Sequence, residues 1–267
     1  MPSATNASTN LNTVAALTYV KYADPNGTET EDSTNTRTGN ETYVFKSVPT
    51  ITQVPLTSAN LINGATMDLY KFTVAAPLQG PVNVKQIKVT VNWSDAASAD
   101  ALEIESIKLL KNGVDITSAV SIVDTNGLTA ESTNGVSEAD NAVIITWDGS
   151  TEDTISAGSS TTYTIRGVPQ GFNVLGSTDT GKDGVSFGFT VDTAHQTSGY
   201  NYINVGTTLT GILKLFSSAT ANASAENANL IWSDESAVAH SASTTAGTND
   251  WSNSYLFNTV GSQSWSY

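Results

Sequence analysis

The feature that most constrains the fold of this chain is an alternation of apolar and polar residues with a period of two. From Glu41 onward the alternation recurs in segment after segment, as where Val185, Phe187 and Phe189 share one face of a predicted strand. A period of two is the period of a β-strand, whose successive side chains point to opposite faces of a sheet. Helical patterns with a period of 3.6 are nearly absent, and the polar stretch 128–139 is the best candidate for a short helical turn.

Turn signals separate the alternating segments at spacings of about 8–15 residues. The predicted strands are centred on residues 43–45, 70–74, 82–93, 102–109, 143–147, 163–165, 185–191 and 209–215. One face of each such strand is buried and the other meets water, as in antiparallel sheets. We therefore expect an all-β antiparallel sandwich of the Ig-like or jelly-roll kind.

Two phase slips interrupt this alternation and predict β-bulges. The first lies between Val84 and Ile87, where one extra residue at Lys85–Gln86 restores the phase. A similar slip occurs at Ser106. A bulge inserts one extra residue that has no residue opposite it on the partner strand. The segment 111–114, Lys-Asn-Gly-Val, then predicts an Asn-Gly hairpin turn.

The first 40 residues differ from the rest because they are polar and rich in turn residues. Thr13–Tyr22 is a strand-like run, and Asp24–Gly27 is a strong turn signal. We expect residues 28–40 to form an exposed loop or linker. The chain is thus predicted to consist of an N-terminal arm, residues 1–40, and a β-sandwich domain, residues 41–267.

Charge and composition exclude several classes of partner. Acidic residues outnumber basic ones, 25 against 11, and the net charge is -14. Such a surface repels phosphate backbones and anionic lipid, so we expect neither nucleic-acid binding nor membrane adhesion. No apolar run is long enough to span a bilayer, so we expect no membrane insertion.

The residue types also suggest a location. The chain has no cysteine, which excludes disulfides and thiolate zinc sites. Few lysines with much Thr, Ser, Asn and Gly is typical of a cell-surface or extracellular protein. Residues 1–12 lack the basic and apolar regions of a signal peptide, so we expect that secretion would have removed one before this numbering begins.

The catalytic motifs in the sequence do not indicate an enzyme. Gly184–Gly188 matches the Gly-x-Ser-x-Gly nucleophile elbow, but it lies within an alternating strand instead of at a strand-to-helix turn. His195 and His240 both read as loop residues without a second histidine at metal-ligand spacing. No set of acid, base and nucleophile emerges, and we expect no cofactor other than a possible calcium ion.

Calcium is the metal that the loops suit best. Asp179 and Asp183 place two carboxylates in one Gly-containing turn, and 124–131 resembles a shortened calcium loop. Hard oxygen ligands on turns are the ligands that Ca²⁺ prefers. The alternative for both segments is an ordinary Asx turn.

Three of the five tryptophans lie near the C-terminus. Trp232 and Trp251 are predicted at strand ends and partly in the core, whereas Trp265 and Tyr267 are the candidates for contact with a neighbouring subunit. Aromatic residues at 200, 202 and 251–255 offer an alternative function, a platform on which sugars stack.

Several segments of the sequence resemble those of one protein family. They are Ser47–Thr52, Met67–Ala75, Gly80–Lys88, Thr154–Ser159 with Thr162–Ile165, and Ile231–His240 with Asp250–Trp251. The chain is similar, over about residues 43–267, to large predicted surface proteins of ultrasmall uncultivated bacteria of the candidate phyla radiation. In that family the closing tryptophan segment ends a β-sandwich module. The resemblance implies an extracellular structural or surface-layer role and supplies no catalytic residues.

Two functions therefore compete at the level of sequence. The first is an extracellular structural protein that polymerises with itself into a filament or surface layer. The strand at 13–22 would complete the sheet of a neighbouring subunit, with Leu17 and Tyr19, or alternatively Val14, Thr18 and Val20, as its inserted side chains. The alternative is that the same strand joins its own sheet. The second function is a cell-surface adhesin or module that binds glycans.

Overall fold

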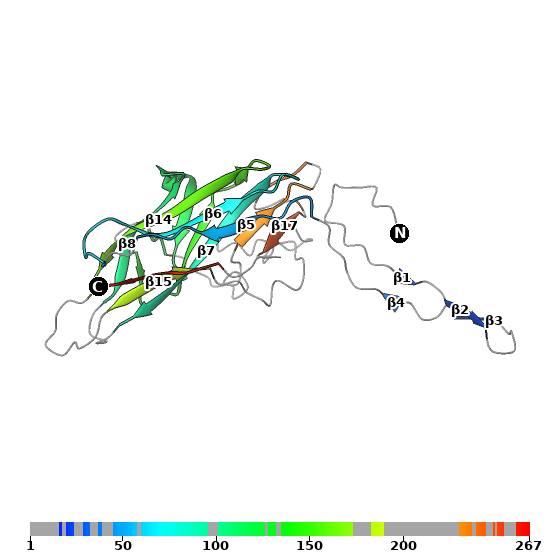
Figure 1. The fold of residues 1–267 in the computed structure, drawn as a ribbon, viewed down its shortest axis with the longest axis horizontal. Coiled ribbons are helices and arrows are strands. Elements are labelled where there is room, and N and C mark those ends of the chain that lie inside the picture. Colours follow the sequence, from blue (N-terminus) through cyan, green and yellow to red (C-terminus); the bar gives the residue numbers. More distant parts are fainter. Residues whose placement is uncertain are drawn as a thin grey trace.

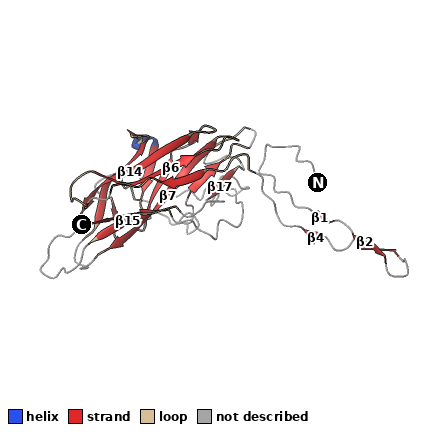
Figure 2. Cartoon of the chain, viewed as in Figure 1, coloured by secondary structure: helices blue, strands red, loops and turns tan. Residues whose placement is uncertain are grey.

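Two antiparallel β-sheets packed face to face form the body of the chain (Figure 1). This computed structural model describes residues 16–17, 20–23, 29–32, 37–38, 45–57, 60–95, 101–125, 128–131, 135–172, 183–189, 230–236, 239–243, 248, 250–253 and 260–267. Within these ranges nearly every element is a strand, and the one helical element is the 3₁₀ turn η1, Thr117–Ala119 (Figure 2). The expected all-β sandwich is confirmed.

The first sheet, here called the β7 sheet, is organised around β7 (Val82–Ser94). Its other strands are β10 (Val120–Val123), β12 (Ala142–Trp147), β13 (Asp153–Ile155), β15 (Gly184–Gly188), β16 (Leu230–Ser233), β17 (Trp251–Asn253) and β18 (Gln263–Ser266). β12 and β13 pair with successive parts of β7 along one side, and β15 and β16 do so along the other. β10 extends the sheet beyond β12, whereas β18 and β17 extend it beyond β15 and β16.

The second sheet, here called the β14 sheet, has the strand order β11-β8-β14-β6-β5, with the short β9 also paired to β8. Its strands are β5 (Thr50–Gln53), β6 (Met67–Ala75), β8 (Glu103–Lys111), β9 (Val114–Asp115), β11 (Val136–Ser137) and β14 (Ser160–Gln170). The longest ladders join β14 to β6 and to β8. All of these pairings are antiparallel, as the alternation predicts.

The hydrophobic core lies between the two sheets. Val84, Ile87 and Val89 on β7 face it and are fully buried. From the β14 sheet, the ring of Phe72 lies 5.4 Å from that of Tyr163, centroid to centroid. Burying apolar surface stabilises the fold by roughly 25 cal/mol per Å², so these central strands contribute most to holding the sheets together.

Both predicted bulges are confirmed. Ile231 of β16 is opposite Gln86, whereas Trp232 is opposite Val84, which leaves Lys85 as the extra residue. The second bulge follows Ser106, whose φ is 51°, and shifts the register between β8 and β14.

The Asn-Gly turn between β8 and β9 is also confirmed. Asn112 and Gly113 both have positive φ, 49° and 85°. Positive φ at both central residues is the geometry of a type I′ hairpin turn, which favours this dipeptide.

Prolines and hydrogen bonds between the sheets protect parts of the sandwich edges. Prolines at 49 and 55 flank the edge strand β5, and proline at an edge discourages further pairing. On one side Trp265 donates a hydrogen bond from Nε1 to the carbonyl oxygen of Leu69, which ties β18 to β6. On the other side Ala130 donates to Ile122 of β10 and accepts from the amide of Ile107 on β8.

Ahead of the sandwich, four short strands form an N-terminal hairpin. β2 (Val20–Ala23) pairs with β3 (Glu29–Asp32), and β1 (Ala16–Leu17) pairs with β4 (Arg37–Thr38). The strand predicted at 13–22 therefore has a local partner. That partner comes from residues 28–40, which we expected to be loop or linker, so this expectation was wrong for the paired residues.

The expected helical turn at 128–139 and the expected strand at 209–215 have different outcomes. The helical turn proposed for 128–139 was wrong where the structure describes it, because Thr129 forms a β-bridge to Val123 and residues 136–137 form β11. The strand predicted at 209–215 lies outside the described residues. In the part of the chain that is described, no helix has the length and apolarity to cross a membrane.

Candidate functional site

The residues proposed to insert into a neighbour lie in or near the N-terminal hairpin. Leu17 is in β1 opposite Arg37, and Val20 is in β2 opposite Asp32. Val14, Thr18 and Tyr19 lie outside the described residues. The described strands of the arm thus have the extended conformation that strand addition requires, although they are already paired with each other.

The two aromatic residues proposed for a subunit contact differ in exposure. Trp265 is only 6% exposed and belongs to the core of its own sandwich. Its predicted role as a contact residue is therefore corrected, because a ring that fills its own core has little surface left for a neighbour. Tyr267 is 37% exposed, and its role in a contact stays a prediction.

The proposed calcium ligands are not brought together by the described structure. Asp179 lies outside the described residues, and Asp183 is fully buried beside β15. In the second candidate loop, Asp124 accepts a hydrogen bond from the amide of Leu128 at 2.8 Å, which is the geometry of a side-chain-capped turn. Among described residues no cluster of three or more His, Asp or Glu residues has the geometry to hold a metal ion.

The structure also shows where the nucleophile-elbow pattern and part of the proposed aromatic platform lie. Gly184–Gly188 is β15, and Ser186 is paired with Asn92 and Ser264 on either side, so the segment is a strand and not a nucleophile elbow. Trp251 is fully buried and donates from Nε1 to Ser241, so it cannot serve as a surface for sugars. The other aromatics of that proposed platform, at 200, 202 and 255, lie outside the described residues.

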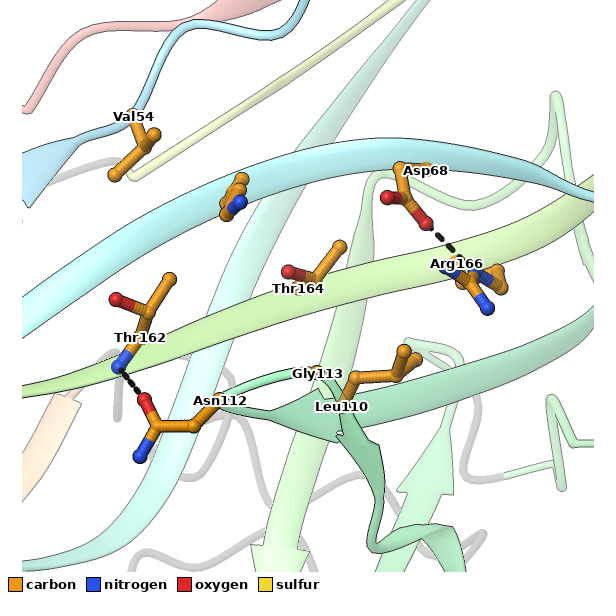
Figure 3. A pocket seen from close by; sticks show the side chains of 9 residues that line it. Val54, Asp68, Leu110, Asn112, Gly113, Thr162, Thr164 and Arg166 are labelled. Atoms are coloured by element: carbon orange, nitrogen blue, oxygen red, sulfur yellow. Dashed lines mark hydrogen bonds and ion pairs between the residues drawn. The ribbon is translucent and has the colours of Figure 1, made fainter.

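A polar hollow of about 420 Å³ opens on the outer face of the β14 sheet (Figure 3). Its lining residues come mainly from β6, β14 and the β8–β9 turn, and they are Val54, Asp68, Lys71, Leu110, Asn112, Gly113, Thr162, Thr164 and Arg166. Arg166 donates to Asp68 at 2.6 Å, and the amide of Thr162 donates to Asn112 at 2.9 Å (Figure 3). Hydroxyl, amide and charged groups therefore surround one shallow space.

The ammonium group of Lys71 is the unbalanced charge of this hollow. Arg166 is neutralised by Asp68, whereas the Lys71 side chain has no hydrogen-bond or ion-pair partner among the described residues. The whole chain carries a net charge of -14. A half-buried lysine without a partner in such a protein marks a place where a carboxylate or a sugar hydroxyl would bind favourably.

A second polar cluster, here called the His240 cluster, covers the outer face of the β7 sheet. His240 contacts Asp250 through Nδ1 at 2.7 Å and Glu152 through Nε2 at 3.0 Å. Asn83 on β7 donates to Glu152 at 3.2 Å and to Glu235 at 2.9 Å. The cluster joins the C-terminal segment to β7 and to the turn before β13.

The charge of this histidine is set by its neighbours. Burial lowers the pKa of His240, but hydrogen bonds to Asp250 and Glu152, together with their charges, outweigh burial and raise its pKa to about 10. A protonated imidazole with both nitrogens donating to carboxylates is a fixed ion pair. With both nitrogens so engaged, the imidazole links Asp250 to Glu152.

Beside this cluster lies a buried lysine at the first β-bulge. The ammonium of Lys85 donates to the carbonyl oxygens of Trp147, Gly149 and Thr151 at 2.7–2.8 Å. Burial, opposed by the charges of Glu152 and Asp148, lowers the pKa of Lys85 to about 8. The side chain satisfies three backbone acceptors at the end of β12 and in the connection from β12 to β13.

A third polar group, formed by Lys111, Asp153 and Tyr163, spans the two sheets. Both the ammonium of Lys111 and the hydroxyl of Tyr163 hydrogen-bond the carboxylate of Asp153. Burial, with the charge and hydrogen bond of Asp153, raises the pKa of Tyr163 well above 10.

Comparison with known proteins assigns no family. No protein-family model matches the chain, and no curated protein matches it either.

The sequence did not predict the His240 cluster, the contacts of Lys85 or the group formed by Lys111, Asp153 and Tyr163. The alternation predicts only which face of a sheet a strand residue points to, and not which groups its side chain contacts. This limit applies to four strand residues of these groups: Asn83, Lys85, Lys111 and Asp153. Many of the partners are distant in sequence: Lys111 and Asp153 are 42 positions apart, and Asn83 and Glu235 are 152 apart. The only available signal was the phase slip at Lys85, which predicts a bulge but not what the side chain binds.

Proposed function

We propose that this protein is an extracellular structural subunit that assembles with copies of itself into a filament or surface layer. The observation that carries the proposal is the N-terminal hairpin. Its two ladders contain two strands each, and neither is joined to a ladder of the sandwich among the described residues (Figure 1).

A hairpin of this kind gains stability from a third strand. An isolated two-stranded hairpin is marginally stable in water, and three or more strands are needed for independent stability. The edge of a neighbouring sheet would supply the missing strand through main-chain hydrogen bonds. Because β1 and β2 already have partners, we propose that the hairpin adds as a unit instead of as a single donor strand.

Such a contact would join unlike surfaces, the arm of one subunit and the sandwich of the next. A head-to-tail contact produces open polymers when its rotation does not close a ring. The chain's polar composition and its lack of cysteine are compatible with an extracellular role.

Sedimentation velocity tests the role of the arm. The full chain should sediment as species that grow with protein concentration, whereas a chain lacking residues 1–40 should sediment as a monomer. Because the sandwich strands begin at Thr50, the shortened chain should keep its circular dichroism and its unfolding midpoint. Equal association by the two proteins would contradict the proposal.

A second function, binding of an acidic or hydroxyl-rich ligand such as a surface glycan, is favoured by the hollow around Lys71. A glycan array with the full chain would test it, with Lys71→Met as the test variant and Lys108→Met as the control outside the hollow. We expect binding to fall at least tenfold in Lys71→Met alone. Unchanged binding by Lys71→Met would rule out this site.

A further inference from the structure

Lys111, Asp153 and Tyr163 form a partly buried contact between the two sheets. Lys111 ends β8 and is the ladder partner of Tyr163 on β14, so both belong to the β14 sheet. Asp153 begins β13 and is paired with Val84 in the β7 sheet. This is therefore a place where an amine from one sheet meets a carboxyl group from the other.

The geometry places the reactive atoms in contact. Nζ of Lys111 contacts Oδ1 of Asp153, and the hydroxyl of Tyr163 donates to Oδ2. The side chain of Asp153 is only 9% exposed and that of Lys111 is 31% exposed. Tyr163 is fully buried, and the Trp147 ring lies against it edge-on at a centroid distance of 5.9 Å.

We propose that Lys111 and Asp153 react to form an amide bond that covalently joins the two sheets. The Lys111 ammonium first passes one proton to Oδ1 of Asp153, which it contacts. The freed lone pair of Nζ then attacks Cγ, a new N–C bond forms, and a second proton moves from nitrogen to the oxygen that will leave. One C–O bond of the carboxyl group then breaks, and its oxygen leaves as water. An ammonium and a carboxylate are thus converted to one amide and one water molecule, without any oxidant, reductant or cofactor.

Tyr163 has a role in this step that its position defines. Its hydroxyl is aimed at the carboxyl oxygen on which negative charge develops as nitrogen attacks, so it stabilises the intermediate by a hydrogen bond. Because burial raises its pKa, the phenol keeps its proton at neutral pH and remains a donor. It acts as a positioning and polarising residue, while Lys111 and Asp153 are the groups that react.

Proximity supplies the driving force that free amines and carboxylates lack in water. Intramolecular reactions between well-oriented groups can reach effective molarities of about 10⁵ M or more. The surrounding rings also limit access of the water that would reverse the step. In a chain without cysteine, such a bond would be a covalent link between sheets that needs no oxidising compartment.

Mass spectrometry of protease-digested, denatured full-length protein tests the proposal. We expect a branched peptide that contains both Lys111 and Asp153 and is lighter than the sum of its two parts by one water molecule. The chain offers an internal control in Lys108 and Asp115, an ion pair of 3.1 Å whose side chains are 51% and 47% exposed. These two residues should be recovered in unlinked peptides.

Two variants make the test independent of folding failure. Lys111→Arg keeps a cation beside Asp153 but should abolish the branched peptide completely. Tyr163→Phe should leave a mixture in which unlinked peptides are at least several-fold more abundant than in the unaltered protein. Recovery of Lys111 and Asp153 only in unlinked peptides from the folded, unaltered protein would overturn the proposal and leave an ion pair. Complete linkage in Tyr163→Phe would overturn the role assigned to Tyr163.

Discussion

Single residues in this sandwich hold charge in places that the strand pattern does not reveal. His240 is the clearest case, because its side chain is 13% exposed and lies between two carboxylates. The pKa of this histidine is about 10 in the folded chain, against about 6.5 in an unfolded one. Folding therefore takes up a proton at neutral and mildly alkaline pH.

This proton uptake predicts how stability depends on pH. A pKa that is raised on folding stabilises the protein fully below pH 6.5, and that contribution is lost as the pH rises toward 10. Between pH 6.5 and 8, the free energy of unfolding should fall by up to about 1.4 kcal/mol per pH unit relative to a His240→Gln variant. Urea unfolding of both proteins across this range is the measurement.

The upper limit of that range is chosen because of Lys85. Its pKa is lowered to about 8 on folding, so above pH 8 the contribution of Lys85 to stability rises with pH, opposite in sign to that of His240. Parallel pH profiles for the unaltered protein and His240→Gln would show that the imidazole is not charged in the folded state.

At the scale of elements, glycines in the connections between strands fix the paths of the turns. Gly113 in the β8–β9 turn and Gly171 after β14 have similar positive φ values, 85° and 77°. They differ in their surroundings. A Cβ atom at 113 would meet nothing within 4 Å, whereas one at 171 would lie 2.1 Å from the carbonyl oxygen of Ala101.

This difference predicts unequal costs for the same substitution. Gly113→Ala should destabilise the fold by about 1 kcal/mol, the cost of a left-handed backbone for a residue with a side chain. Gly171→Ala should cost about 3 kcal/mol or more, because backbone atoms must also move. Thermal or urea unfolding of the two variants gives the comparison. Similar losses in both would contradict the assigned packing at Gly171.

Local features of a strand could be predicted from the sequence, whereas pairing between distant strands could not. The bulge at Lys85–Gln86 was predictable because a phase slip is a local property of one strand. The pairing of β7 with β12, β13, β15 and β16 was not, since register between distant segments depends on the whole core. The partner strands β3 and β4 were missed because their residues are too polar to show an alternation.

The same limit applies to the candidate sites. Trp265 was predicted to contact a neighbour because it lies near the end of the chain, whereas its ring packs in the core. Position in the sequence does not determine burial, which depends on the strands that cover a residue. The cluster of Lys111, Asp153 and Tyr163 required three strands from two sheets to be placed before it could be recognised.

At the scale of the whole molecule, assembly must overcome electrostatic repulsion. Each subunit carries a net charge of -14, so copies of the chain repel one another at neutral pH and low ionic strength. Salt screens exposed charges over about 10 Å at 0.1 M. Main-chain hydrogen bonds in an intermolecular ladder depend much less on salt, so we expect added salt to speed association more than it stabilises the polymer once formed.

We propose that subunits polymerise through the N-terminal hairpin. Negative-stain electron microscopy of the purified full chain, beside a chain that lacks residues 1–40, tests this claim most directly. We predict filaments or ordered sheets from the full chain and only single particles of the sandwich from the shortened one. Polymers of normal length and shape from the shortened chain would contradict the claim, as would a full chain that remains monomeric at every concentration and salt tested.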